Sequence, residues 1–195
     1  MQKTGLLLID VQKGLDDPSL GTRNNPGAEK NIQKLLLVWR NRGLPVVHIQ
    51  HCSIESDSKL RPELPGNEIK LEAQPRPEET LFKKSVNSAF IGTGLEKYLR
   101  ENEVLTLVIV GFTTDHCVSA STRMASDLGF EVTLVSDATA AFGRVGYDDI
   151  LYSGEEIHTI NLVSLDGEFC NVRSTEEVLR TIPPYLPRQL HDQNR

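Results

Sequence analysis

The stretch "GFTTDHCVSASTRM" (residues 111–124) contains the cysteine with the clearest chemical setting in the chain. The pattern after the apolar run predicts a helix that begins near Cys117, with Thr114 or Asp115 as its N-cap. In the first turn of a helix, free backbone N–H groups and the helix dipole stabilise a thiolate and can receive an oxyanion. Cys117 is therefore a candidate nucleophile, and a buried structural thiol is the alternative.

The segment His116-Cys117-x5-Arg123 also matches the signature of a cysteine phosphatase. A loop that cradles phosphate needs backbone N–H groups turned inward, which usually requires glycines. The intervening "VSAST" has none and is typical of an amphipathic helix. We therefore interpret Arg123 as an ordinary helix residue. His116 cannot face its neighbour Cys117 across a helix, and we interpret it as a surface or supporting residue.

Two further residues with reactive side chains follow apolar runs. Asp10 follows "GLLLI", where it is either a loop-capping carboxylate or a base whose pKa is raised by burial. Gln12 replaces the second aspartate that an aspartyl phosphatase would need. Lys84 ends "TLFKK", and because side chains alternate along a strand, only one of Lys83 and Lys84 can enter a site.

The histidines in "HIQHC" (residues 48–52) raise the question of a metal site. His48 and His51 are three residues apart on an expected strand, so their side chains point to opposite faces. A core or pocket-lining role is favoured for both, and no metal site is expected.

Short apolar runs alternate with helical patterns, which is typical of a parallel α/β sheet. We expect strands over 5–9, 45–50, 80–84, 104–110, 131–136 and 168–172. We expect helices from Asn25-Pro26 to about 42, over 92–101, from 117 to 129, through most of 149–165, and after a capping box at Ser174 and Glu177. The polar, proline-rich segment 53–78 is expected to be a long surface loop.

This order of elements predicts a three-layer, doubly wound, mostly parallel six-stranded sheet of the Rossmann-like kind. Ligands bind such sheets beyond the carboxyl ends of the strands, where the strand order reverses. In the common order 3-2-1-4-5-6, strands one and four are neighbours at that reversal. Asp10, Lys84 and Cys117 are therefore expected on one rim of the sheet.

Composition limits the classes of partner. The chain has 195 residues, 38% of them hydrophobic and 25% charged, with a net charge of −6. We expect one domain over residues 1–182 with a C-terminal tail over 183–195, and no nucleic acid or membrane partner. The three cysteines form no CxxC pair, and the N-terminal apolar run is too short for a signal peptide, so a reducing, cytoplasmic location is expected.

Four stretches together resemble the isochorismatase-like cysteine hydrolase superfamily, which includes nicotinamidases and N-carbamoylsarcosine amidases. They are "LLLIDVQKGL", "KSVNSAF", "LVIVGFTTDHCVSASTRMASDLGF" and "VTLVSDATAAF", and the likeness extends over residues 4–180. The resemblance implies a catalytic triad of Asp10, Lys84 and Cys117. It also implies a cis peptide bond between Phe112 and Thr113, with the backbone N–H groups of Thr113 and Cys117 forming an oxyanion hole.

The activity that the resemblance implies is hydrolysis of a C–N bond in a small amide, lactam, carbamoyl or ureido compound, through a cysteine thioester and without a cofactor. The Asp-x-His metal cluster of nicotinamidases has no counterpart here, which disfavours that activity. Isochorismatases do not use a cysteine nucleophile, and some carry a carrier-protein domain for which this chain has no room. Vinyl-ether hydrolysis of the isochorismatase type, or a catalytically idle binding or assembly protein of the same fold, remain the alternatives.

A small-molecule substrate and a homo-oligomeric assembly are also implied by the resemblance. Residues expected to bind the substrate are Gln12, Leu15, Asn87, Phe90, Phe112 and Phe142. Leu15 stands where the family often has an aromatic side chain.

Overall fold

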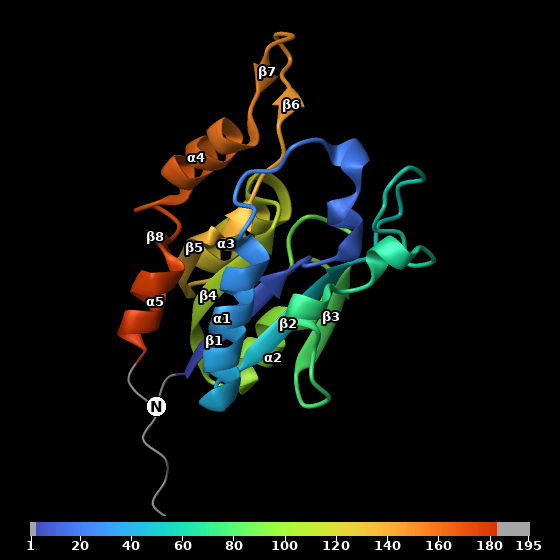
Figure 1. The fold of residues 1–195 in the computed structure, drawn as a ribbon. Coiled ribbons are helices and arrows are strands. Elements are labelled where there is room, and N and C mark those ends of the chain that lie inside the picture. The colour runs from blue at the N-terminus through green and yellow to red at the C-terminus, as the bar shows by residue number, and fades with distance from the viewer. Residues whose placement is uncertain (1–2, 183–195) are drawn as a thin grey trace, which may run out of the picture.

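Six parallel strands form the central sheet of the computed structural model, which describes residues 3–182 (Figure 1). The strands are β1 (Lys3–Ile9), β2 (Val46–His51), β3 (Thr80–Lys84), β4 (Val104–Phe112), β5 (Glu131–Ala140) and β8 (Asn171–Arg173). Their order is β3-β2-β1-β4-β5-β8, and every neighbouring pair is parallel. The predicted doubly wound fold is confirmed, and the order reverses between β1 and β4 as expected. The predicted tail, residues 183–195, lies outside the described residues.

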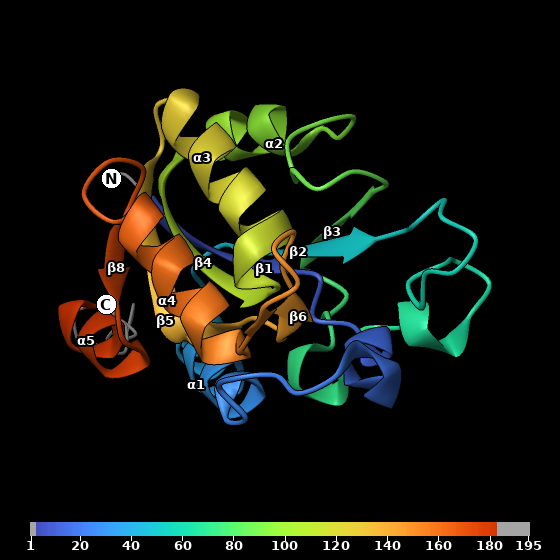
Figure 2. The same cartoon turned by 90° about the horizontal axis from the view of Figure 1, so that it is seen from above.

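Helices cover both faces of this sheet (Figure 2). α1 (Ala28–Asn41) and α5 (Thr175–Thr181) lie on one face, and α2 (Leu95–Glu101), α3 (Ser119–Asp127) and α4 (Gly154–Leu165) lie on the other. Alternation along β1 divides its leucines between the two cores: Leu6 and Leu8 pack with α1, whereas Leu7 packs with α2 and α3. Because both faces are buried, the central strands contain continuous apolar runs, over 5–9 in β1 and 107–112 in β4, which made them visible in the sequence.

The segment expected to be mostly helical, 149–165, is helical only from α4 onward. Before it, β6 (Arg144–Val145) and β7 (Leu151–Tyr152) form an antiparallel hairpin that projects from the body of the protein (Figure 1). Strands of two residues are too short to produce a readable alternation, so the hairpin had no signal in the sequence. α4 instead begins after Ser153, which forms a capping box with Glu156.

Two other expected boundaries shift for local reasons. Asn25 does not cap α1, because its side-chain amide donates to the carbonyl oxygens of Ser136 and Thr139 at the end of β5. The last strand begins at Asn171 rather than residue 168, since the N–H of Gly167 bonds to the Cys170 carbonyl and closes a turn there. The capping box at Ser174 is confirmed.

The segment 53–78 is a surface excursion, as expected, but part of it is packed against the body. Asn67, Ile69 and Lys70 are buried, and Ile69 forms a β-bridge with Gln12. This contact fixes the excursion beside the carboxyl end of β1. Within residues 3–182, no helix is both long and apolar enough to cross a membrane.

Gly111 brings β4 against β1 at the rim. It is paired with Ile9 and has a φ of +117°, a conformation that side chains other than glycine rarely adopt. A Cβ at this position would fall inside the backbone of Ile9, the residue that precedes Asp10. The close approach of the two strands therefore requires glycine.

We expect Gly111→Ala to lower the free energy of unfolding by about 2 kcal/mol or more, because it adds both backbone strain and a steric overlap. Urea unfolding measures the change. Gly129→Ala is the matched control, since Gly129 also has a positive φ, of +83°, but has open space around its Cα. Equal losses in the two variants would show that the contact with Ile9 is unimportant.

Candidate active site

The carboxyl ends of β1, β3 and β4 bring the three predicted reactive residues together. Asp10 follows β1, Lys84 ends β3 and Cys117 lies in the turn after β4. The Lys84 ammonium Nζ lies 2.6 Å from Asp10 Oδ2 and 3.2 Å from Cys117 Sγ, and all three residues are buried. Lys83, its neighbour on the strand, is exposed, so alternation along β3 selects which lysine enters the site.

Lys84 has a third partner, His51, which the sequence analysis did not include among the site residues. Nζ lies 2.8 Å from Nδ1 of His51, the last residue of β2. An ammonium group has three N–H donors, and here each has an acceptor. The position of His51 at the carboxyl end of the strand between β1 and β3 was the available signal. Its separation from His48 was correctly interpreted, because His48 lies apart from the site and pairs with Glu79.

Asp10 is held in a constrained position at the end of β1. Its φ is +51°, its N–H donates to the Ile49 carbonyl, and its Oδ1 atom is buried without a hydrogen-bond partner among the described residues. Burial raises the pKa of the Asp10 carboxyl, and the neighbouring Lys84 charge opposes this effect only in part. Asp10 is therefore a stronger base than an exposed aspartate, with one oxygen free to accept a proton.

Cys117 differs from the expectation of a pre-formed thiolate. Burial and then the negative charge of Asp10 raise the pKa of its thiol to about 12, against the opposing effect of Lys84. Neither expected N-cap is present: Thr114 bonds to His158, and Asp115 pairs with Arg144. Cys117 lies within a π-helical turn, Thr114–Val118, and α3 begins only at Ser119. The resting side chain is a neutral thiol.

The turn before Cys117 positions the backbone groups that the resemblance assigns to an oxyanion hole. The Phe112–Thr113 peptide bond is cis, and the Thr113 carbonyl accepts from the N–H groups of His116 and Val118. Among the described residues, no backbone group accepts from the Thr113 N–H. That N–H, one of the two predicted oxyanion donors, is thus uncommitted to the backbone network.

Burial and charge also set the state of His51. Its pKa is lowered to about 4, first by burial and then by the positive charge of Lys84, so its imidazole is neutral near pH 7. Its backbone is clamped by two side chains. Gln12 accepts from the His51 N–H at 2.8 Å and donates to its carbonyl at 3.0 Å, and Asn67 donates to the same carbonyl at 2.8 Å.

The six residues expected to bind substrate have different surroundings, and one of them contacts the thiol of Cys117. Asn87 reaches it, with Oδ1 3.7 Å from Cys117 Sγ. Gln12 and Phe112 are fully buried and therefore support the site from within, Gln12 through His51 and Phe112 through the core beneath Arg23.

Leu15, Phe90 and Phe142 pack against different parts of the protein. Leu15 packs against the core on the α1 face, and Phe142 forms a β-bridge with Arg23. Phe90 packs on Phe130 and against the apolar cluster that also contains Cys117. The sequence could identify the rim but not the direction of each side chain.

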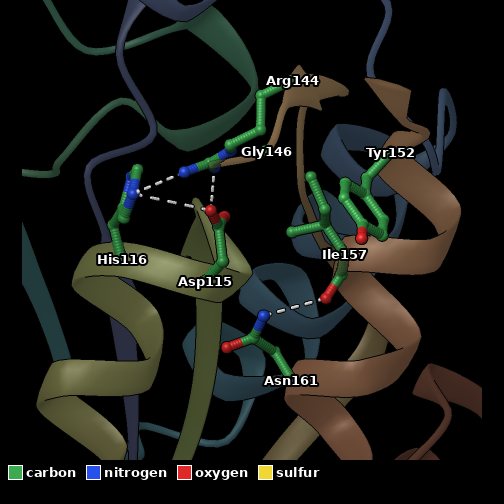
Figure 3. Close-up of a pocket in the computed structure, with 7 residues that line it drawn as sticks. All are labelled: Asp115, His116, Arg144, Gly146, Tyr152, Ile157 and Asn161. Atoms are coloured by element: carbon green, nitrogen blue, oxygen red, sulfur yellow. Dashed lines mark hydrogen bonds and ion pairs between the residues drawn. The ribbon is translucent and has the colours of Figure 1, made fainter. Parts of the chain in front are cut away.

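A hollow of about 270 Å³ lies next to the Cys117 turn, between that turn, the β6–β7 hairpin and α4 (Figure 3). Arg144 reaches from β6 to pair with Asp115 and to contact Nε2 of His116 at 2.9 Å. Asp10, Lys84 and Cys117 do not line this hollow. The contacts of Arg144 join the hairpin to the turn that contains the thiol.

Asp10, His51 and Cys117 also have the types and spacing of metal ligands, with one ligand atom from each lying within 4.8 Å of the others. Lys84 Nζ is within hydrogen-bond distance of all three residues, so its ammonium group already supplies a positive charge at that point. We assign no metal to this cluster.

Comparison with known proteins identifies the family of this chain. The isochorismatase domain model matches residues 4–177. The uncharacterised isochorismatase-family protein YrdC of Bacillus subtilis is 46% identical over 178 residues, which cover 91% of this chain and 95% of that protein. A crystal structure of an isochorismatase-family protein from Chromobacterium violaceum superposes with a TM-score of 0.88 at 47% identity, covering 91% of this chain and 92% of that one.

Two more distant relatives are named for their substrates. A streptothricin hydrolase from Streptomyces noursei is 32% identical over 148 residues, which cover 74% of this chain and 52% of that enzyme. The ureidoacrylate amidohydrolase RutB of Agrobacterium fabrum is 26% identical over 176 residues, covering 72% of this chain and 77% of that enzyme. With the family model matching most of its length, this chain belongs to the isochorismatase family of hydrolases.

Proposed function

We propose that the protein is a cysteine hydrolase that cleaves a C–N bond in a small amide, lactam, carbamoyl or ureido compound. The observation that supports this most strongly is the position of the buried Lys84 ammonium between the Asp10 carboxylate and the Cys117 thiol. Nucleophilic acyl transfer needs a nucleophile next to a base, and here one cation contacts both of them.

A thiol with a pKa of about 12 can be activated if the net charge of the buried cluster does not change. If Cys117 lost its proton to water, the buried cluster would acquire a net negative charge. If the proton moves to Asp10, the net charge of Asp10, Lys84 and Cys117 stays at zero. Burial raises the pKa of Asp10 as well, which brings its proton affinity closer to that of the thiol. Transfer within the cluster is therefore the favourable route.

The subsequent steps follow from acyl-transfer chemistry. The Cys117 thiolate attacks the carbonyl carbon, and the N–H groups of Thr113 and Cys117 stabilise the tetrahedral oxyanion. Asp10 returns its proton to the departing nitrogen, the C–N bond breaks, and a thioester remains on Cys117. Asp10 then takes a proton from water as the water oxygen attacks the thioester carbon. The C–S bond breaks, the acid is released, and Asp10 returns the proton to the Cys117 sulfur. Lys84 keeps its charge throughout.

The activities for which two relatives are named support the choice of bond. One is named an amidohydrolase acting on ureidoacrylate, and the other a hydrolase of streptothricin. Their lower identities leave the substrate of this chain within a broad class of small C–N compounds.

Cys117→Ala is expected to reduce turnover by at least about 10³-fold, because it removes the atom that forms the thioester. A screen of small amides, lactams and ureido compounds for ammonia or amine release provides the assay. Cys170→Ala is the matched control, since burial also raises the pKa of that thiol to about 12, but Cys170 packs near α4 and β8. Turnover at the normal rate in Cys117→Ala would disprove the proposal.

Asp10→Asn is expected to change thiol reactivity and turnover in opposite directions. The substitution removes a negative charge that raises the pKa of Cys117, so alkylation by iodoacetamide at pH 8 should become faster. Turnover should fall by about 10²-fold or more, because asparagine cannot accept the thiol proton or return it. Asp127→Asn, at an exposed carboxylate on α3, serves as the control. A slower alkylation in Asp10→Asn, or unchanged turnover, would contradict this assignment.

A further inference from the structure

His51 makes a contact that a purely structural histidine would not need. Its Nδ1 atom lies 2.8 Å from Lys84 Nζ and 3.9 Å from both Asp10 Oδ2 and Cys117 Sγ. Resting on the proposed hydrolysis, we propose that His51 is a positioning residue: Nδ1 accepts the third hydrogen of the Lys84 ammonium, which fixes the Nε2–H tautomer and leaves that N–H as a donor to a substrate oxygen.

The buried Lys84 ammonium needs three acceptors. Its side chain has no exposed surface, and an ammonium group can only donate. Asp10 Oδ2, His51 Nδ1 and Cys117 Sγ are its three acceptors. Without His51, one N–H would be buried without a partner, and the ammonium could rotate to seek another. His51 therefore sets the direction of the two remaining N–H bonds, toward the base and the nucleophile.

The contact with Lys84 fixes the tautomer of the His51 imidazole. Because Lys84 donates to Nδ1, the Nδ1 atom cannot carry a hydrogen, and a neutral imidazole must then be protonated at Nε2. The low pKa of His51, about 4, agrees with a neutral ring at physiological pH. The charged or titratable groups that face it are Lys84 from β3, Asp10 from the end of β1 and Cys117 from the π-helical turn.

Hydrogen bonds from side chains hold the backbone of His51 in place. Gln12 bonds to both its N–H and its carbonyl, and Asn67 bonds to the carbonyl as well. Asn67 is in turn held by Gln50, which donates to its side-chain oxygen at 2.9 Å. Side chains from two separate segments thus fix one residue at the end of β2. This degree of restraint is expected where the direction of a side chain matters.

The second nitrogen of the His51 ring indicates the chemistry of the ligand. Nδ1 and Nε2 lie on different edges of an imidazole, so when Nδ1 faces the buried ammonium, Nε2 faces away from it. The side chain is 13% exposed, in contrast to the fully covered Lys84. We infer that the outward N–H is the part of the ring that a substrate can reach. It can donate to a carbonyl or carboxylate oxygen of the substrate and thus favours substrates that place an acceptor there.

The structural part of the proposal can be tested without a substrate. Long-range ¹H–¹⁵N NMR of the histidine rings should show His51 as the Nε2–H tautomer at pH 7, with His51→Asn identifying its signals by their loss. Lys84→Met should raise the pKa of His51, because it removes a positive charge that lowers it. Lys84→Gln should do the same, and guards against a folding defect in Lys84→Met. An Nδ1–H tautomer, or a pKa that neither substitution raises, would overturn the proposal.

The functional part needs a turned-over compound from the amide screen and two variants. His51→Asn places an oxygen near the position of Nδ1, so kcat should stay within about threefold while KM rises about tenfold for loss of the outward ring N–H. His51→Leu offers no acceptor, and kcat should fall about 10- to 100-fold. His48→Asn, on the same strand and paired with Glu79, is the control. Equal kcat losses in the Asn and Leu variants would refute positioning through Lys84.

The two arms separate this proposal from the proposed function. If the tautomer and the pKa response are as expected but no amide is turned over, the arrangement of His51 stands and the hydrolase assignment fails. If turnover depends on Cys117 but His51 has the other tautomer, the hydrolase assignment stands and the role of His51 fails.

Discussion

The burial of one ammonium group governs the arrangement of this site. A lysine side chain with no exposed surface is costly unless its charge and all three of its hydrogens have partners. Here β1, β2 and the turn after β4 each supply one acceptor, namely Asp10, His51 and Cys117. These acceptors are useful for catalysis because the same groups that satisfy Lys84 are a base, a neutral imidazole and a thiol. The requirement to satisfy the cation therefore assembles the reactive groups.

The sheet makes this convergence possible. Adjacent parallel strands end on one rim, so residues that are from about 30 to over 100 positions apart in sequence meet without any local motif. Two features then bring the rim to working distances. Gly111 allows β4 to approach Ile9 closely, and Gln12 and Asn67 hold the end of β2. Several buried polar residues that resemble site residues in the sequence thus act on the backbone of the site rather than on a ligand.

The predictability of each feature depended on the range of the interactions that determine it. The fold was predictable because apolar strands and their order follow from burial of both sheet faces, and residues 5–9 of β1 and 107–112 of β4 are all buried. The rim position of Asp10, Lys84 and Cys117 followed from strand ends. The two-residue strands of the β6–β7 hairpin left no periodicity to detect, and side-chain direction at Phe90, Phe112 and Phe142 depends on tertiary packing. A core or pocket-lining role was expected for His51, but its contact with Lys84 was not predicted because that charge lies on another strand.

The protonation state of Cys117 is set by its tertiary environment rather than by its local position before a helix. A cysteine at the start of a helix is expected to ionise readily, since the helix terminus stabilises its anion. In the folded chain, burial and Asp10 outweigh that effect, and the pKa of Cys117 is raised to about 12. A neutral thiol is consistent with the rest of the cluster, because the Asp10 charge already balances that of Lys84 and a second buried anion would have no counter-charge. With Asp10 in place, the favourable route for the thiol proton is transfer to that carboxylate, so turnover depends on Asp10 rather than on the helix.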